Sequence, residues 1–274
     1  MPVGSLPVSP PYLPRTNPVS TSAKTIQFSR KTSPPVGGYK TSQPACLLRY
    51  NFAAMLKSLI FDFDGLILDT ETPEFRVWQS IYRTHGQEIP IQQWGQIIGG
   101  YGASRFDAAQ YLCDLTRDSL DADSLRIQHD QQSDELIKQQ PVLPGVLDLL
   151  DEADRLNIKL AVASSSPHKW VDTHLSRLGL ARRFDKVICA DDVPPGRTKP
   201  NPDLFLLALN QLQVPKEAAV VFEDSPNGIR AANSAGIFAV AVPNPITSML
   251  TFEGESIRLN SLADLKLADL LARF

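Results

Sequence analysis

Cysteine is scarce in this chain, whose 274 residues include only Cys46, Cys113 and Cys189. An odd number at such wide spacing does not form the framework of a disulfide-stapled protein. The cysteines and the four histidines also lack the spacing of a metal site. The sequence therefore favours a reducing compartment, and we expect a cytoplasmic protein.

Long apolar runs are also missing. None approaches the roughly 20 residues that a membrane helix needs, so we expect no membrane partner. The composition, 43% hydrophobic and 21% charged, is ordinary for a globular protein. The length fits one large domain or a core with a smaller companion, and a monomer is the default expectation.

Acidic residues are absent from residues 1–54, which carry six Lys and Arg. The rest of the chain holds 21 basic and 30 acidic residues. Nucleic-acid backbones need a basic surface, so this acidic main part argues against nucleic acid as a ligand.

Residues 1–54 differ from the rest in composition as well, because nine of the 22 prolines lie there among many Ser and Thr. Such a segment has too little apolar surface to fold alone, and we expect it to be disordered. Two interpretations stay open. It is either an organelle transit peptide, which would place the protein in the plastid, or sequence upstream of a true start at Met55.

From Met55 onward, short apolar runs alternate with amphipathic segments. Strands are predicted within 55–63, 158–165, 186–190, 218–225 and 237–243, and helices at 146–156, 169–178, 202–212 and 226–235. This alternation predicts an α/β fold, with a Rossmann-like parallel sheet covered by helices on both faces. Residues 256–274 suggest an edge strand and a closing helix.

Residues 72–140 break the alternation, because they have helical periodicity and contain no good strand. A helical insert of this length directly after the first strand predicts a separate small domain. We therefore expect a core formed by residues 55–71 and 141–274, with a helical domain at 72–140.

The first strand carries acids where apolar residues are expected. In "LIFDFDGLILDT" (residues 59–70), Asp62 and Asp64 end the strand and Asp69 follows. Burying a carboxylate costs several kcal/mol unless it is compensated. The carboxyl ends of such strands are where α/β sheets bind ligands, and alternation places Asp62 and Asp64 on one side. Magnesium would relieve their repulsion. A helix cap or an ion pair is the alternative explanation for these two acids alone.

Other strand ends carry polar residues too. Ser164, Ser165 and Ser166 follow one strand and precede a helix, an arrangement that suits a phosphate. Glu223 and Asp224 end another strand, and Lys199 lies in a loop before a helix. Together these residues predict a site for a phosphoryl group and magnesium at one edge of the sheet.

Four motifs in this order resemble the haloacid dehalogenase (HAD) superfamily. They are "DFDGLILDT", Ser164 after a strand, Lys199 in "KPNPDLF" and "EDSPNGIRAANSAG". The resemblance covers about residues 56–250 and is greatest to the branch of phosphatases and β-phosphoglucomutase. It implies a HAD-like core and identifies residues 72–140 as a mobile cap.

The resemblance also implies roles for these acids. Asp62 would be the nucleophile that forms an aspartyl-phosphate, and Asp64 the general acid and then the base. Magnesium would be held by the Asp62 carboxylate, the Asp64 backbone carbonyl and Asp224, with Glu223 close by.

The same resemblance implies that Ser164 and Lys199 hold the phosphoryl oxygens, with Ser165 as a further donor. The expected partner is thus a small-molecule phosphate ester.

Hydrolysis and phosphoryl transfer within a sugar both remain open. In the mutases a histidine of the cap hinge follows the "DT", and Glu74 stands there in this chain. We therefore favour a magnesium-dependent phosphatase acting on a sugar or polyol phosphate, with a β-phosphoglucomutase-type mutase as the alternative. Arg105 either matches a cap arginine that binds a second phosphate or faces solvent.

A third possibility is a magnesium-binding protein with little turnover. The intact pair of Asp62 and Asp64 argues against it, since a protein without catalysis is free to lose either acid.

Overall fold

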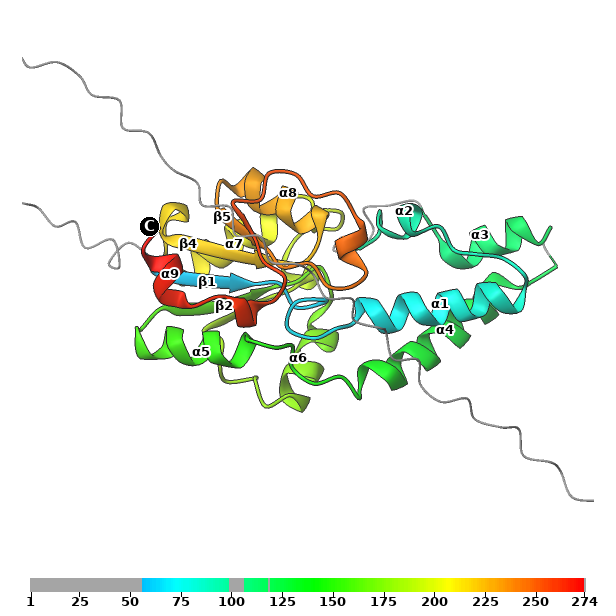
Figure 1. Cartoon of the computed structure of the whole chain (residues 1–274), viewed down its shortest axis with the longest axis horizontal. Coiled ribbons are helices and arrows are strands. Elements are labelled where there is room, and N and C mark those ends of the chain that lie inside the picture. The colour runs from blue at the N-terminus through cyan, green and yellow to red at the C-terminus, as the bar shows by residue number, and fades with distance from the viewer. Residues whose placement is uncertain (1–55, 99–105, 118, 274) are drawn as a thin grey trace, which may run out of the picture. The chain divides into compact units, whose positions relative to one another are not determined.

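A six-stranded parallel sheet forms the centre of the computed structural model, which describes residues 56–98, 106–117 and 119–273 (Figure 1). The strands lie in the order β3-β2-β1-β4-β5-β6. Their bounds are β1 (Ser58–Phe61), β2 (Lys159–Ala163), β3 (Lys186–Ile188), β4 (Ala219–Glu223), β5 (Phe238–Ala241) and β6 (Ile257–Arg258). The predicted α/β class is confirmed, and β1 lies between β2 and β4, at whose carboxyl ends lie Ser164, Ser165, Glu223 and Asp224.

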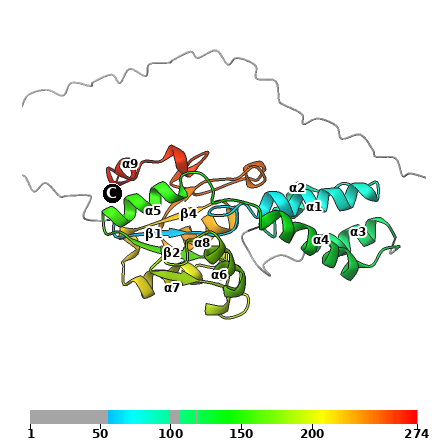
Figure 2. The same ribbon diagram turned by 90° about the horizontal axis from the view of Figure 1, so that it is seen from below.

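Alternation of side chains along the strands builds two hydrophobic layers. Leu59 and Phe61 point into one layer and Ile60 into the other. The first layer is covered by α5 (Val146–Arg155), α6 (His168–Arg177) and α9 (Leu267–Leu271), and the second by α7 (Asp203–Leu212) and α8 (Pro226–Ala235). Figure 2 shows α5 and α7 on opposite sides of the strands. Helices on both faces are what a buried parallel sheet requires.

The core helices begin and end within two residues of the predicted positions. In α8, Ser225 accepts a hydrogen bond from the backbone N–H of Gly228, Pro226 occupies the first helical position, and Gly236 ends the helix at a φ of 71°. The predicted edge strand and closing helix of the tail are present as β6 and α9.

A helical insert lies in the chain between β1 and β2, as predicted. It contains α1 (Glu71–Thr84), α2 (Ile91–Trp94), α3 (Ala108–Leu115) and α4 (Ala122–Ile137). α1 packs along α4, and Phe75, Trp78 and Leu112 belong to a hydrophobic cluster of the insert. Its division from the core at residues 72 and 140 stays a prediction. Arg105 and residues 1–54 lie outside the described residues.

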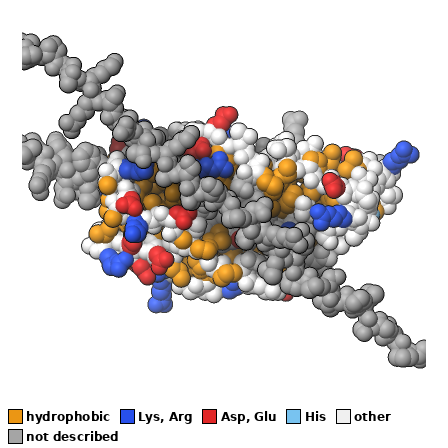
Figure 3. All heavy atoms as spheres, viewed as in Figure 1, with side chains coloured by type: hydrophobic (Ala, Val, Ile, Leu, Met, Phe, Trp, Pro, Cys, Tyr) orange, Lys and Arg blue, Asp and Glu red, His pale blue; other side chains and the backbone are white. Residues whose placement is uncertain are grey.

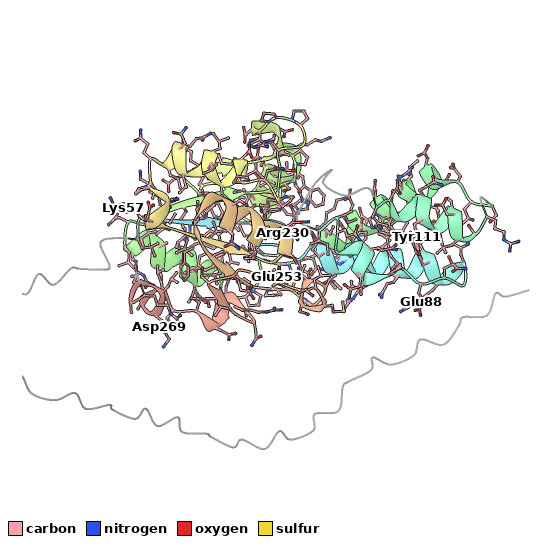
Figure 4. All side chains as sticks on the ribbon, turned by 90° about the horizontal axis from the view of Figure 1, so that it is seen from above. Lys57, Glu88, Tyr111, Arg230, Glu253 and Asp269 are labelled. Atoms are coloured by element: carbon pink, nitrogen blue, oxygen red, sulfur yellow. The ribbon has the colours of Figure 1, made fainter. Side chains whose placement is uncertain are left out.

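The surface carries charges of both signs. On the face seen in Figure 3, Lys and Arg side chains are interspersed with Asp and Glu over the α/β core. Figure 4 shows Lys57 at the amino end of β1, whereas Glu88 and Tyr111 lie on the helical insert. Among the described residues, no helix combines the length and the apolar character needed to cross a bilayer.

Candidate active site

Asp62 lies at the centre of the sheet edge where the strands end. It directly follows β1, and its backbone N–H donates to the carbonyl of Phe222 on β4 at 3.0 Å. The residue is 3% exposed. This burial, together with the nearby Glu223 carboxylate, raises the pKa of Asp62 to about 8, although Lys199 acts in the opposite direction. An acid in this setting needs a cation to stay ionised at neutral pH.

Lys199 supplies one such cation. The Lys199 side chain is fully buried, and its Nζ lies 2.5 Å from both Asp62 Oδ1 and Glu223 Oε1. Burial alone would lower the pKa of Lys199, but the two carboxylates outweigh it and raise the pKa above the ordinary value. The ammonium group therefore remains charged and ties the end of β1 to the end of β4.

Glu223 is held on both of its carboxylate oxygens. Oε1 accepts from Lys199, and Oε2 accepts from the backbone N–H and the hydroxyl of Ser225 at 3.1 and 3.0 Å. A Cβ atom on Gly228 would lie 1.8 Å from Cδ of Glu223, so only glycine fits at this position in the first turn of α8. This packing fixes Glu223 as the anchor of Lys199.

Asp224 is held on one oxygen only. Oδ2 accepts from Nδ2 of Asn244 at 2.8 Å, whereas Oδ1 is buried and has no hydrogen-bond partner among the described residues. Gly65 allows this approach, because a Cβ atom there would lie 2.3 Å from Asp224 Oδ2. A buried carboxylate oxygen without a donor costs free energy, so it marks a place for a ligand.

The three buried acids fit a divalent metal. One oxygen each of Asp62, Glu223 and Asp224 lies within 4.8 Å of the others. Burial and then the charges of Glu223 and Asp62 raise the pKa of Asp224 well above its ordinary value, so Lys199 alone does not balance the three carboxylates. Hard oxygen donors of this kind suit magnesium. The predicted ligand atom of Asp64, its backbone carbonyl, stays a prediction.

The Asp64 carboxylate faces the loop after β2. Its Oδ2 accepts from the hydroxyls of Ser164 and Ser166 at 3.1 and 2.7 Å, and its Oδ1 accepts from Nε1 of Trp170 at 2.8 Å. β1 ends at Phe61, before both acids, so the alternation expected to place Asp62 and Asp64 on one side of a strand stays a prediction. The chain turns at Gly65, whose φ is 78°, and the two carboxylates have separate hydrogen-bond partners.

The serine loop lies where the sequence predicted it. Ser164 and Ser165 are buried directly after β2, and the backbone N–H of Ser166 donates to Ser164 Oγ at 3.0 Å. α6 follows from His168, so the loop leads into a helix N-terminus, a favourable setting for an anion. The structure thus brings Ser164 to Asp64 and Lys199 to Asp62.

Two glutamates extend the acidic character of the site into the helical insert. Glu71 is buried in the first turn of α1, and burial followed by the charge of Glu74 raises its pKa well above the ordinary value. Burial and then the charge of Asp64 raise the pKa of Glu74 to about 8. The backbone carbonyl of Glu74 contacts Nε2 of His129 at 3.2 Å. Glu74 was singled out from the sequence, but Glu71 was not.

Three further neighbours of the site were not identified from the sequence: Asn244, Ser166 as a partner of Asp64, and Trp170. Asn244 lies in the loop after β5, and the pattern of polar residues at strand ends extends to it. Trp170 had no sequence signal, because a tryptophan in an amphipathic helix is ordinarily a packing residue.

Comparison with known proteins gives a consistent result. A sequence model described as haloacid dehalogenase-like hydrolase matches residues 59–242. YhcW of Bacillus subtilis (strain 168), a protein provisionally named a phosphatase, is 42% identical over 79% of this chain and 97% of its own length. The fructose-1-phosphate phosphatase YqaB of Escherichia coli (strain K12) is 32% identical over 67% of this chain and 95% of its own.

Solved structures agree with the fold. CbbY from Rhodobacter sphaeroides in complex with xylulose-(1,5)bisphosphate is 27% identical with a TM-score of 0.58, covering 77% of this chain and 96% of that one. A conserved haloacid dehalogenase-like protein of Agrobacterium tumefaciens str. C58, at 24% identity, has a TM-score of 0.64 over 80% of this chain and 98% of its own, which supports the fold alone.

Proposed function

We propose that this chain, which belongs to the haloacid dehalogenase-like hydrolases and is a phosphatase of that family, hydrolyses a small sugar or polyol phosphate. The reaction would pass through an aspartyl-phosphate on Asp62. The observation that carries the proposal is the arrangement around Asp62. Its carboxylate is buried and paired with Lys199, and a second acid with separate partners, Asp64, follows two residues later.

In the first step, a carboxylate oxygen of Asp62 attacks phosphorus, and the bond from phosphorus to the ester oxygen breaks. Asp64 gives its proton to the departing alkoxide, which leaves as an alcohol. In the second step, Asp64 takes a proton from water, the water oxygen bonds to phosphorus, and the bond to Asp62 breaks. Inorganic phosphate is released and Asp62 returns to its starting state.

The phosphoryl oxygens would be bound by Ser164, Ser165 and Lys199. The hydroxyl of Ser164 donates to Asp64, so it lies next to the proposed general acid and would turn to a phosphoryl oxygen when one binds. Lys199 keeps its charge because Asp62 and Glu223 raise its pKa, and it thus offers a fixed cation to a dianionic group.

Magnesium would be held by Asp62 and Asp224, with the Asp64 carbonyl as a further donor and Glu223 alongside. The unpartnered Oδ1 of Asp224 supports this assignment. When bound, the ion neutralises charge on the carboxylate and the phosphate. Asn244 keeps Asp224 oriented toward it by holding the other oxygen.

The substrate class is supported by relatives that are named as phosphatases of phosphorylated carbohydrates and of fructose 1-phosphate. We assign the helical insert, residues 72–140, as the cap that recognises the substrate. Glu71, directly before it, and Glu74, within its first helix, offer carboxyl groups suited to hydroxyls of a sugar or polyol. Arg105 would be a further contact from the cap.

The mutase alternative is weaker. In this chain Glu74 stands where the mutases have their hinge histidine. A histidine of α4, His129, contacts the backbone of Glu74. Nε2 of His129 contacts the Glu74 carbonyl and Nδ1 contacts Asp130 at 3.1 Å, so both ring nitrogens already have partners. This arrangement leaves His129 without a nitrogen to gate Asp64.

Phosphate release tests the proposal. Wild-type protein with magnesium should release inorganic phosphate from fructose 1-phosphate or another member of a sugar and polyol phosphate panel, and Asp62→Asn should lose more than about 1,000-fold of that rate. Equal rates for the two proteins would exclude Asp62 as the nucleophile. Conversion of β-glucose 1-phosphate into glucose 6-phosphate without phosphate release would favour the mutase.

A further inference from the structure

The indole of Trp170 donates a hydrogen bond to an acid of the site, although the proposed chemistry does not require it. It lies in the first turn of α6, half-buried, with Nε1 at 2.8 Å from Oδ1 of Asp64. An indole N–H is a donor and has no acceptor function. Oδ1 of Asp64 therefore faces a group that can only give it a hydrogen bond.

The second oxygen of Asp64 has partners of another kind. Oδ2 lies 2.7 Å from the hydroxyl of Ser166 and 3.1 Å from that of Ser164. A hydroxyl rotates and can either donate or accept. The partners of Oδ2 can thus turn toward a phosphoryl oxygen or reverse their polarity, which Trp170 cannot do. The two oxygens of Asp64 are chemically unequal for this reason.

The Trp170 ring is itself held in place. Its plane meets the His174 ring edge-on, with ring centroids 4.3 Å apart. His174 is buried, and burial followed by the charge of Arg177 lowers its pKa, so its Nδ1 can accept from Nε of Arg177 at 3.3 Å. Arg177 also donates to the carbonyl of Gln140 at 3.0 Å. Rotation of the indole would break this packing.

We propose that Trp170 is a positioning residue, which occupies Oδ1 of Asp64 so that Oδ2 is the oxygen that meets the leaving group and then the attacking water. This inference rests on the proposed function, in which Asp64 exchanges a proton with the ester oxygen. A phenylalanine would keep the aromatic packing but release Oδ1. The carboxyl group could then rotate, and fewer substrate complexes would have Oδ2 in place.

Leaving-group dependence tests the proposal. An alkoxide must be protonated as it departs, whereas the more acidic p-nitrophenol leaves without much help. The ratio kcat/KM reports only the first step, in which the leaving group departs. Trp170→Phe should therefore lower kcat/KM for the best sugar or polyol phosphate of the panel by about 10-fold or more, and kcat/KM for p-nitrophenyl phosphate by less than about twofold. Ser166→Ala should show the same pattern more weakly, since Ser164 still contacts Oδ2.

Two outcomes would overturn the role of Trp170 while leaving the phosphatase intact. One is an equal loss of kcat/KM on both substrates, which indicates a structural effect. The other is a higher kcat/KM for the sugar phosphate, which indicates that Trp170 holds Asp64 in an unproductive orientation. Wild-type protein that hydrolyses neither substrate would overturn the proposed function, and this inference with it. Trp78→Phe is the matched control, because Trp78 packs on His129 in the helical insert and should affect both substrates alike.

A second readout does not depend on turnover. The chain has three tryptophans, so its nitrogen–proton NMR spectrum has three indole signals, and Trp170→Phe identifies the one from Trp170. Asp64→Asn should shift the Trp170 signal and leave those of Trp78 and Trp94 in place. An unmoved Trp170 signal would show that the hydrogen bond to Asp64 is absent in solution.

Discussion

Nζ of Lys199 lies 2.5 Å from Oδ1 of Asp62, and both residues are buried at the carboxyl end of the central strand. The lysine makes a second contact of the same length with Glu223. One fixed cation thus serves two acids that come from separate strands. This relationship places the proposed nucleophile, and it makes the site sensitive to the loss of a single charge.

Lys199→Met tests that sensitivity. Removing one partner of a buried ion pair leaves the other charge uncompensated, so we expect the free energy of unfolding without magnesium to fall by about 3 to 5 kcal/mol. Urea denaturation measures it, and phosphate release should also be lost. The control is Lys138→Met, because Lys138 pairs with Glu135 at the exposed surface and should change stability little. A small effect at Lys199 would mean that Asp62 and Glu223 do not depend on this ammonium.

Asn244→Ala tests the orientation of Asp224. Without its amide partner, Oδ2 of Asp224 is free and the carboxylate can turn, so the affinity for magnesium should weaken by about 10-fold. Isothermal titration calorimetry with magnesium alone gives this affinity without any substrate. Asn260→Ala, at an exposed position, should bind magnesium as the wild type does. Unchanged binding by Asn244→Ala would separate Asn244 from the metal site.

Glu74→Gln tests the acidic start of the helical insert. Folding raises the pKa of Glu74 from 4.5 to about 8. Between these pH values the Glu74 carboxyl group stays protonated in the folded protein but is ionised in the unfolded chain. The contribution of Glu74 to stability is therefore complete below pH 4.5 and is lost as the pH rises toward 8. Glu74→Gln should reduce the fall in stability between these values.

Urea denaturation at several pH values, without magnesium, measures the effect of Glu74. Glu217→Gln, at an exposed position of the α/β part of the chain, serves as the control and should leave the pH dependence of the free energy of unfolding unchanged. If Glu74→Gln and wild-type protein lose stability in parallel, Glu74 does not titrate in the folded state as described.

Much of this site could be predicted from the sequence, because strand ends meet at one edge of a parallel sheet. Acids at the end of a buried strand, as at Asp62 and Glu223, conflict with the apolar surroundings, and that conflict was visible without any structure. Ser164 was located by its place at another strand end, and Lys199 by its place in a loop before a helix. The order of strands and helices followed from periodicity for a related reason, since each element must bury one apolar face.

What could not be predicted depends on side-chain direction and on turns. The partners of Asp64 lie on the serine loop and on α6, beyond the end of β1, and the alternation of an extended strand does not specify them. The contact between Trp170 and Asp64 requires the angle at which α6 leaves the sheet, and sequence periodicity does not determine that angle. Asn244 reaches Asp224 from a loop whose path is set by its own hydrogen bonds.

The central claim, that Asp62 becomes phosphorylated, is tested most directly by trapping the intermediate. Asp64→Asn lacks the base that activates water, so with magnesium and p-nitrophenyl phosphate it should accumulate the aspartyl-phosphate. After an acid quench, peptide mass spectrometry should locate one phosphoryl group on Asp62, and the double variant with Asp62→Asn should carry none. A phosphoryl group on another residue, or none on Asp64→Asn while it still releases p-nitrophenol in a stoichiometric burst, would contradict the account.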